Sequence, residues 1–249
     1  MSPLTWADTP SDRFTTVSEA TGGRRERRKA QTRAEVRETA QRLFAERGFD
    51  AVTIADVATA ADVAVQTVFN HFETKEALFF DGRTPWVEGA AAAVSRRPPG
   101  ADPVAALRGY LEKDLRLLLE QETRPENRSY LEALDRSPSL QARERTLVEQ
   151  AGERVTAVLS EAVAAGDWPA APVPDPSTTP VLSQLVAALF LVAGRVLVLE
   201  NRRLVLHPEP GRSRHLSVQA ATVTTLAELE HCVAGLAARL LDPALDGPG

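Results

Sequence analysis

The fold is decided by residues 32–78, which read TRAEVRETAQRLFAERGFDAVTIADVATAADVAVQTVFNHFETKEAL. Apolar residues recur along this stretch at spacings of three and four, which is the period of an amphipathic helix. Capping residues and a glycine interrupt that period at short intervals. The pattern predicts three short helices and the start of a fourth. The first helix is expected to bury one stripe, formed by Val36, Ala40, Leu43 and Phe44.

The predicted helix ends follow from residues that satisfy free backbone groups. Thr32 and Glu35 have the spacing of a capping box, which predicts that the first helix begins at Thr32. Gly48 is expected just past the end of this helix, where glycine is common. Thr53 and Thr74 are expected to cap the second and fourth helices, because a threonine hydroxyl accepts a hydrogen bond from a backbone amide one turn on.

The window that begins at Ile54 has the pattern of a helix-turn-helix. Ala58 is small enough for two helices to cross closely, and Val57 and Val68 can pack beside the crossing. Asp62 stands at the turn position where glycine is usual. Aspartate enters the left-handed conformation at modest cost because its short polar side chain bonds locally. The window therefore predicts two short helices joined by a tight turn.

The third helix is expected to run from about Val65 to His71. Its apolar side chains are expected to point inward and its polar side chains outward. The residues assigned to the interior are Val65, Val68, Phe69 and Phe72. The residues assigned to the outer face are Gln66, Thr67, Asn70 and His71.

The composition indicates an all-α globular protein with a substantial core. The chain has 249 residues, of which 43% are hydrophobic and 25% charged, and no alternating run predicts a strand. The net charge is -5, yet residues 24–47 contain nine basic and four acidic residues. This asymmetry favours a basic nucleic-acid face on an acidic body, although a charge run alone also fits a solvated surface.

Residues 47–78 resemble the DNA-binding domain of TetR-type transcriptional regulators. The resemblance covers about a fifth of the chain and is specific, since spacing and residue types agree throughout. It rests on the step Arg47-Gly48-Phe49, the threonine-capped second helix, the run Thr67-Val68-Phe69 and the start Lys75-Glu76-Ala77-Leu78. The sequence departs from the family pattern at Asp62, at Ala64 in place of a serine cap, and at Val65 and Gln66 in place of the common Lys-Gly.

The resemblance implies a homodimer that binds a pseudo-palindromic double-stranded DNA operator and is released by a small-molecule effector. The residues expected nearest the bases or their phosphates are Gln66, Thr67, Asn70 and His71, since Gln and Asn can pair with adenine and the Thr methyl can meet a thymine methyl. By resemblance, Thr53 and Lys75 are expected to hold phosphates. Arg27 and Arg28 belong to a basic arm that lies along phosphates, enters a minor groove or remains a solvated tail, and the sequence leaves these alternatives open.

Four segments are expected along the chain. They are a disordered tail over 1–23, a helix-turn-helix domain with its basic arm over 24–80, a helical regulatory and dimerisation domain over 81–242, and a disordered tail over 243–249. Gly82 and Pro85 predict a break near residues 82–84, with a new helix beginning at Thr84-Pro85. This break is a candidate hinge between head and body.

The remaining helices are expected at about 102–121, 126–135, 138–165, 178–206 and 213–241, with connectors at 96–100 and 166–176. The helix from Thr178 is the most apolar, but Ser183, Gln184, Gly194 and Arg195 interrupt it, which favours a buried or dimer-forming helix over a membrane span. The candidate dimer interface consists of Leu185, Leu189, Leu226, Leu229, Val233 and Leu236. The candidate ligand contacts are Trp86, Tyr110, Arg116, Tyr130 and Trp168, each of which also fits an ordinary core or surface position.

No catalytic constellation, phosphate loop or metal-spaced Cys and His set is found, so neither an enzyme nor a cofactor is expected. The competing functions are a sequence-tolerant architectural DNA-binding protein and, more weakly, a helical enzyme. The lone Cys232, expected to pack in a helix core, agrees with a reducing compartment. No secretory signal is recognised at the start of the chain. A cytoplasmic bacterial protein is therefore expected.

Overall fold

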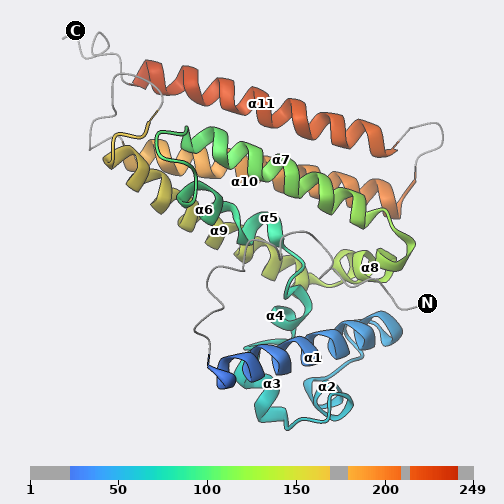
Figure 1. Cartoon of the computed structure of the whole chain (residues 1–249). Coiled ribbons are helices and arrows are strands. Elements are labelled where there is room, and N and C mark those ends of the chain that lie inside the picture. Colours follow the sequence, from blue (N-terminus) through green and yellow to red (C-terminus); the bar gives the residue numbers. More distant parts are fainter. Residues whose placement is uncertain (1–22, 169–178, 209–213, 241–249) are drawn as a thin grey trace. The chain divides into compact units, whose positions relative to one another are not determined.

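The computed structural model describes residues 23–168, 179–208 and 214–240. All regular elements among these residues are helices, so the predicted all-α class is confirmed (Figure 1). The described residues form two compact units, one of residues 23–84 with 126–143 and the other of 85–125 with 144–240. The predicted tails and most of the 166–176 connector lie outside the described residues. The domain boundaries stay a prediction.

The N-terminal unit consists of short helices around an aromatic core. Phe44, Phe49 and Phe79 pack with ring centroids 5.2–5.7 Å apart, and Tyr130 stacks on Phe79 at 4.8 Å. Val36, Ala40, Leu43 and Phe44 are all buried, as their spacing predicted. The helices of this unit are α1 (Arg24–Arg47), α2 (Ile54–Ala60), α3 (Val65–His71), α4 (Lys75–Phe80) and α8 (Arg128–Arg136), with a 3-10 turn at Pro125–Asn127 before α8.

The first helix is longer than predicted. It begins at Arg24, so Thr32 lies inside the helix, and the predicted capping box is wrong. Glu35 accepts instead from the amide of Gln31, four residues earlier, at 2.9 Å. The basic run over 24–29 is thus the beginning of a helix rather than an irregular arm. Arg, Lys, Glu, Gln and Ala are strong helix formers, which explains why the helix continues upstream.

The predicted caps and turn of the helix-turn-helix are confirmed. The Thr53 hydroxyl accepts from the amide of Asp56 at 3.1 Å, and the Asp56 carboxylate accepts from the amide of Thr53 at 2.8 Å. The Thr74 hydroxyl accepts from the amide of Ala77 at 3.0 Å. Asp62 has φ 53° in the turn between α2 and α3, as expected for a residue that replaces glycine there.

The predicted break after the fourth helix is also confirmed. α4 ends at Phe80, and α5 (Pro85–Glu88) begins at the proline. Gly82 has φ 70°, a conformation that side chains with a Cβ rarely adopt. An alanine at this position would therefore strain the turn rather than simply stiffen it.

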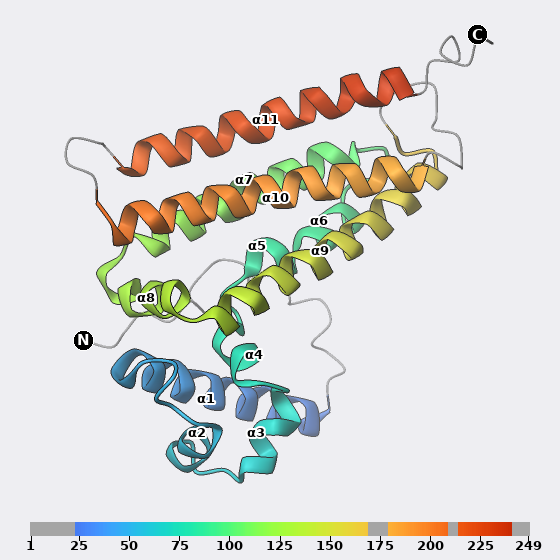
Figure 2. The ribbon, with the colours of Figure 1, turned by 180° about the vertical axis from the view of Figure 1, so that it is seen from behind.

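The C-terminal unit is built on long helices. α7, α10 and α11 contact one another and run side by side in both views (Figures 1 and 2), and α6 packs on α7. Side chains of α7 at the predicted spacing, from Val104 to Leu119, are buried. Cys232, expected in the core, is exposed. The helices of this unit are α5, α6 (Ala90–Ser95), α7 (Pro103–Glu122), most of α9 (Pro138–Ala164), α10 (Thr179–Leu206) and α11 (Arg214–Leu240).

One glycine allows a close approach in this core. Trp86 of α5 is fully buried. A Cβ added at Gly194 of α10 would lie 3.1 Å from the Trp86 ring and 3.3 Å from the side chain of Leu115. The absence of a side chain at Gly194 therefore lets the tryptophan pack against α10.

By length and composition alone, α10 is apolar enough to cross a membrane. It also carries Asn201 and Arg202, which are buried and both donate to the Glu122 carboxylate of α7. Ser183 and Gly194 are buried on the same helix. One side of α10 thus packs as the core helix of a globular unit, in agreement with the sequence-based interpretation.

Candidate nucleic-acid interface

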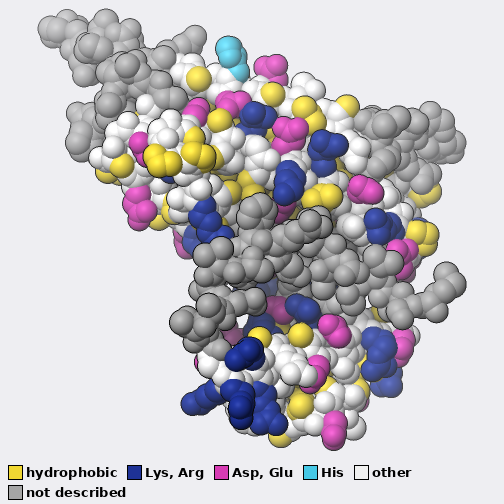
Figure 3. Space-filling view, viewed as in Figure 1, with side chains coloured by type: hydrophobic (Ala, Val, Ile, Leu, Met, Phe, Trp, Pro, Cys, Tyr) yellow, Lys and Arg dark blue, Asp and Glu magenta, His cyan; other side chains and the backbone are white. Residues whose placement is uncertain are grey.

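Basic side chains gather at the beginning of α1. Arg24, Arg25, Arg27, Arg28 and Lys29 are all exposed there. Figure 3 shows Lys and Arg side chains concentrated in the region where Figure 1 places the start of α1. A helical array of exposed cations suits contact with phosphates, since each such contact releases counterions from DNA.

The third helix spans the predicted residues, but its buried face is narrower than predicted. Val68 and Phe72, the residue just after the helix, are buried. In contrast, Val65 is 42% exposed and Phe69 is 46% exposed. The prediction that Val65 and Phe69 face inward is wrong. A helix of seven residues can bury only a narrow strip against α1 and α2, and the other apolar side chains remain outside.

The four polar residues assigned to the outer face of α3 differ in exposure. Gln66 and Asn70 are exposed, and the Gln66 amide donates to the Asn70 amide oxygen at 3.2 Å. Thr67 and His71 are half-buried. Partial burial, with Arg33 and Lys29 nearby, lowers the pKa of His71, so the imidazole is neutral at neutral pH.

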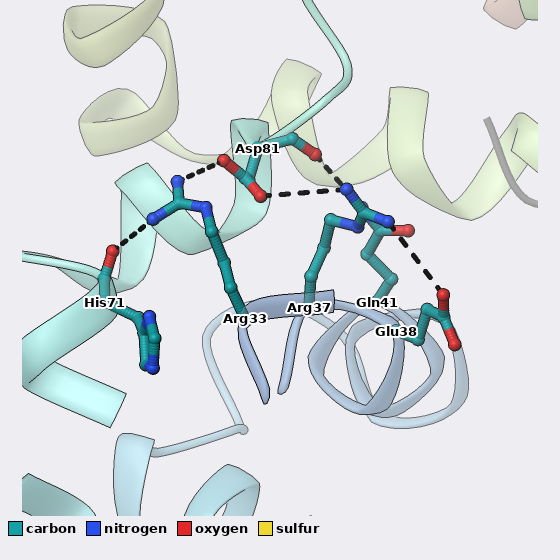
Figure 4. A network of polar contacts seen from close by, with 6 residues as sticks. All are labelled: Arg33, Arg37, Glu38, Gln41, His71 and Asp81. Atoms are coloured by element: carbon teal, nitrogen blue, oxygen red, sulfur yellow. Dashed lines mark hydrogen bonds and ion pairs between the residues drawn. The ribbon is translucent and has the colours of Figure 1, made fainter. Parts of the chain in front are cut away.

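Arg33 of α1 fixes the end of the third helix (Figure 4). One of its nitrogens donates to the His71 carbonyl at 2.5 Å, and the other donates to the Asp81 carboxylate. Its guanidinium also lies 4.3 Å from the centre of the Phe72 ring. Arg33 therefore joins the last turn of α3 to the end of α4.

Arg37 and Gln41 extend this network along the same side of α1. Arg37 forms a 3.9 Å ion pair with Asp81, and the Gln41 amide donates to the Asp81 carbonyl at 3.4 Å. Sequence reasoning missed Arg33 and Asp81 because they are 48 residues apart. Positions 33, 37 and 41 are spaced by four, and this polar stripe opposite the apolar one is the only sequence signal for the network.

The two residues expected to hold phosphates already have partners within the unit. Lys75 donates to the carbonyls of Phe49 and Val52 at 3.0 and 3.1 Å and lies 4.1 Å from the centre of the Phe49 ring. The Thr53 hydroxyl donates to the Asp56 carboxylate at 2.6 Å. The Thr53 hydrogen bonds lower the pKa of Asp56. Lys75 therefore stabilises the segment that leads from α1 into α2.

The candidate interface residues of the body fall into two groups. Leu185 and Leu189 are exposed on α10. Leu226 and Val233 are buried within the chain, and Leu229 is half-buried. The side chain of Leu236 lies outside the described residues. A charge at Val233 would thus act first on the intramolecular core.

The candidate ligand residues are not brought together as one set. Trp86 is buried against α10, whereas Tyr130 lies in the N-terminal unit, where Arg83 stands 4.3 Å from its ring centre. Arg116 is exposed, and Trp168 is buried after α9.

Tyr110 of α7 reaches the backbone of Gly89, at the junction of α5 and α6, and hydrogen-bonds the side chain of Asp114. Burial and the Asp114 carboxylate raise the pKa of Tyr110, and burial raises the pKa of Asp114. Trp86 therefore belongs to the α5–α6 segment of the C-terminal unit, and Tyr110 packs against that segment.

Residues 36–81 match the family model of bacterial regulatory proteins of the tetR family. The chain is 33% identical over 102 residues to the transcriptional regulator TcmR of Streptomyces glaucescens, a match that covers 41% of this chain and 44% of TcmR. These matches show a similarity to the tetR family that is centred on the helix-turn-helix domain, and the match to TcmR spans less than half the length of this curated relative.

Two solved structures resemble the chain over most of its length. NalD of Pseudomonas aeruginosa is 18% identical, with 80% of this chain and 96% of NalD covered and a TM-score of 0.47. GusR of Salmonella enterica is 19% identical, with 81% and 96% covered and a TM-score of 0.46.

Proposed function

We propose that this protein is a cytoplasmic, ligand-responsive transcriptional repressor that binds a pseudo-palindromic operator as a homodimer. The observation that carries the proposal is the presentation of α3. Its residues Gln66 and Asn70 are exposed, while Arg33 holds its end and Asp62 sets the turn before it. A rigidly held short helix with exposed amide side chains suits the reading of base edges in a major groove.

The basic start of α1 supports the same function. Arg27 and Arg28 are exposed on a helix whose later residues contact α3. We assign these two arginines to phosphate contacts, which position the recognition helix without reading sequence. Thr53 and Lys75 are assigned to flanking phosphates by resemblance.

The dimer is proposed to form through α10. Its exposed side carries apolar residues at spacings of three and four, each 39–58% exposed. A row of this kind suits helix pairing, and a second copy would remove it from water. Two-fold symmetry would also place two α3 helices on successive major grooves. The residues of the row are Val181, Leu185, Leu189, Val192, Val196 and Leu199.

The body is proposed to bind a small, mainly apolar effector near Trp86 and Tyr110. These two aromatic residues lie on or against the α5–α6 segment, directly after the break at Gly82. An effector that binds one arrangement of the body more tightly would lower DNA affinity by that difference, typically about 1–3 kcal/mol. The break at residues 82–84 is the proposed place where this change reaches the head.

Selection of binding sites from random duplexes tests the proposal. The expected result is a two-fold footprint with half-site centres about 34–36 Å apart, or slightly more on deformed DNA. Screening of small molecules should then find one that releases the protein from this site. Binding without sequence preference would instead support the architectural alternative.

Two substitutions test the assigned surfaces. Asn70→Ala should weaken the selected site by about 1–3 kcal/mol and random DNA much less. Val192→Glu should shift sedimentation from dimer toward monomer, with Val192→Ala as the milder control. If Asn70→Ala lowers affinity equally for the selected site and for random DNA, Asn70 contacts the DNA without contributing to sequence specificity. An unchanged dimer for Val192→Glu would move the interface away from α10.

A further inference from the structure

The exposed face of α3 carries two large apolar side chains, Val65 and Phe69, in addition to its polar residues. Val65 and Phe69 are 42% and 46% exposed, although residues of these types are usually buried in a small helical unit. Positions four apart lie within about 40° of each other around a helix axis, so the two side chains form one strip. Gln66 and Asn70 form a second strip beside it.

The surroundings of this strip indicate nucleic acid rather than protein as its partner. The strip adjoins the exposed amides of Gln66 and Asn70, and the same unit carries an array of exposed cations at the start of α1. Exposed cations on the unit that carries the strip complement the phosphates that border a major groove. Within that groove, the apolar feature is the 5-methyl group of thymine.

We propose that Val65 and Phe69 read thymine methyl groups, so that operator specificity comes from an apolar strip as well as from the amides of Gln66 and Asn70. The inference rests on the proposed function. Phe69 has no hydroxyl with which to bind a phosphate, and Val65 has no polar group at all. Their contribution is contact with an apolar surface, and each methyl removed from water should strengthen binding about four-fold.

Replacement of single thymines by deoxyuridine tests this assignment, because it removes the methyl group and keeps the base pair. In the selected operator, at least one thymine in each half-site should lose about four-fold in affinity when replaced. This loss of affinity on removal of a thymine methyl group, the methyl sensitivity, should disappear in Phe69→Ala or Val65→Ala. Both side chains are exposed, so the variants should melt at the temperature of the parent protein.

Two matched variants separate this strip from its neighbours. Asn70→Ala should bind more weakly but retain the methyl sensitivity. Thr67→Ser, which removes the methyl group of Thr67 and keeps its hydroxyl, should also retain the methyl sensitivity. Methyl sensitivity that survives in both Val65→Ala and Phe69→Ala would overturn the assignment. The assignment would also be overturned if no replacement of a thymine by deoxyuridine weakens binding, or if the selected operator contains no thymine. Either result would leave the proposed function intact. Binding with no sequence preference would overturn both.

Discussion

Two arginines hold distant elements together, one in each unit, and they do so at different depths. Arg33 binds the His71 carbonyl and the Asp81 carboxylate from a side chain that is 44% exposed. Arg202 of α10 is 8% exposed and binds Glu122 of α7 at 2.6 Å and Glu144 of α9 at 2.5 Å.

The difference in burial between Arg202 and Arg33 indicates that the two ion-paired arginines have different roles. Arg202 lies in an environment where an uncompensated charge is very costly, so its loss should act on the fold. Arg33 lies where water screens its ion pair, so its loss should change stability little. Because Arg33 touches the end of α3, we infer that its contribution is to the orientation of the recognition helix.

The largest expected effect is that of Arg202→Met. It would leave Glu122 and Glu144 buried without their cation and should lower the free energy of unfolding by about 3–5 kcal/mol. Urea unfolding followed by circular dichroism measures this loss. The neighbouring Arg203→Met is the control, because Arg203 pairs with Glu200 at 2.8 Å on an exposed surface and should change stability by about 0.5 kcal/mol or less. Equal losses in the two variants would remove the distinction between buried and exposed pairs.

Arg33→Met should have a small effect on stability and a larger effect on DNA binding. We expect a stability change below about 1 kcal/mol. Operator affinity should fall about ten-fold, which is about 1.4 kcal/mol, because the end of α3 is no longer held.

Two variants serve as controls for Arg33→Met. Arg33→Lys keeps the charge but loses the forked geometry, so it should not restore binding. Arg42→Met, at an exposed position on the same helix, should leave binding unchanged. Full rescue by lysine would show that Arg33 acts through its charge alone.

The buried cluster should also make stability depend on pH. Burial raises the pKa of Glu122 above its ordinary value, against the opposing effects of Arg202 and Asn201. The folded state therefore binds this proton more tightly than the unfolded chain, and stability is lost as pH rises from the ordinary glutamate range through the raised value.

Glu122→Gln removes this titration. The unfolding free energy of the variant relative to the parent should therefore increase from acidic to neutral pH. Glu120→Gln, at an exposed position on α7, is the control and should show no such trend. If the difference in unfolding free energy between Glu122→Gln and the parent does not change with pH, the pKa of Glu122 is the same in the folded and unfolded states.

The smallest expected effect belongs to Lys75, which already binds two carbonyls in the N-terminal unit. If it also meets a phosphate, Lys75→Met should reduce the slope of log affinity against log salt by about 0.9 per half-site. Titrations at several salt concentrations measure this slope. Weaker binding with an unchanged slope would limit Lys75 to the support of the turn.

The sequence determined those features whose hydrogen bonds close within about four residues. The caps at Thr53 and Thr74, the left-handed Asp62 and the break before Pro85 were all predictable, because each depends on a side chain and the backbone beside it. The apolar stripe of α1 was predictable as well, since a long helix repeats its period often enough to define one face.

Only the tertiary structure decided which side of α3 is buried and which charges meet. A seven-residue helix is too short for its period to define a face, so the contacts with α1 and α2 leave Val65 and Phe69 outside. Arg33 with Asp81, and Arg202 with Glu122 and Glu144, are joined across 48 to 80 residues. No local pattern encodes such pairs, because their partners are chosen by how the helices pack.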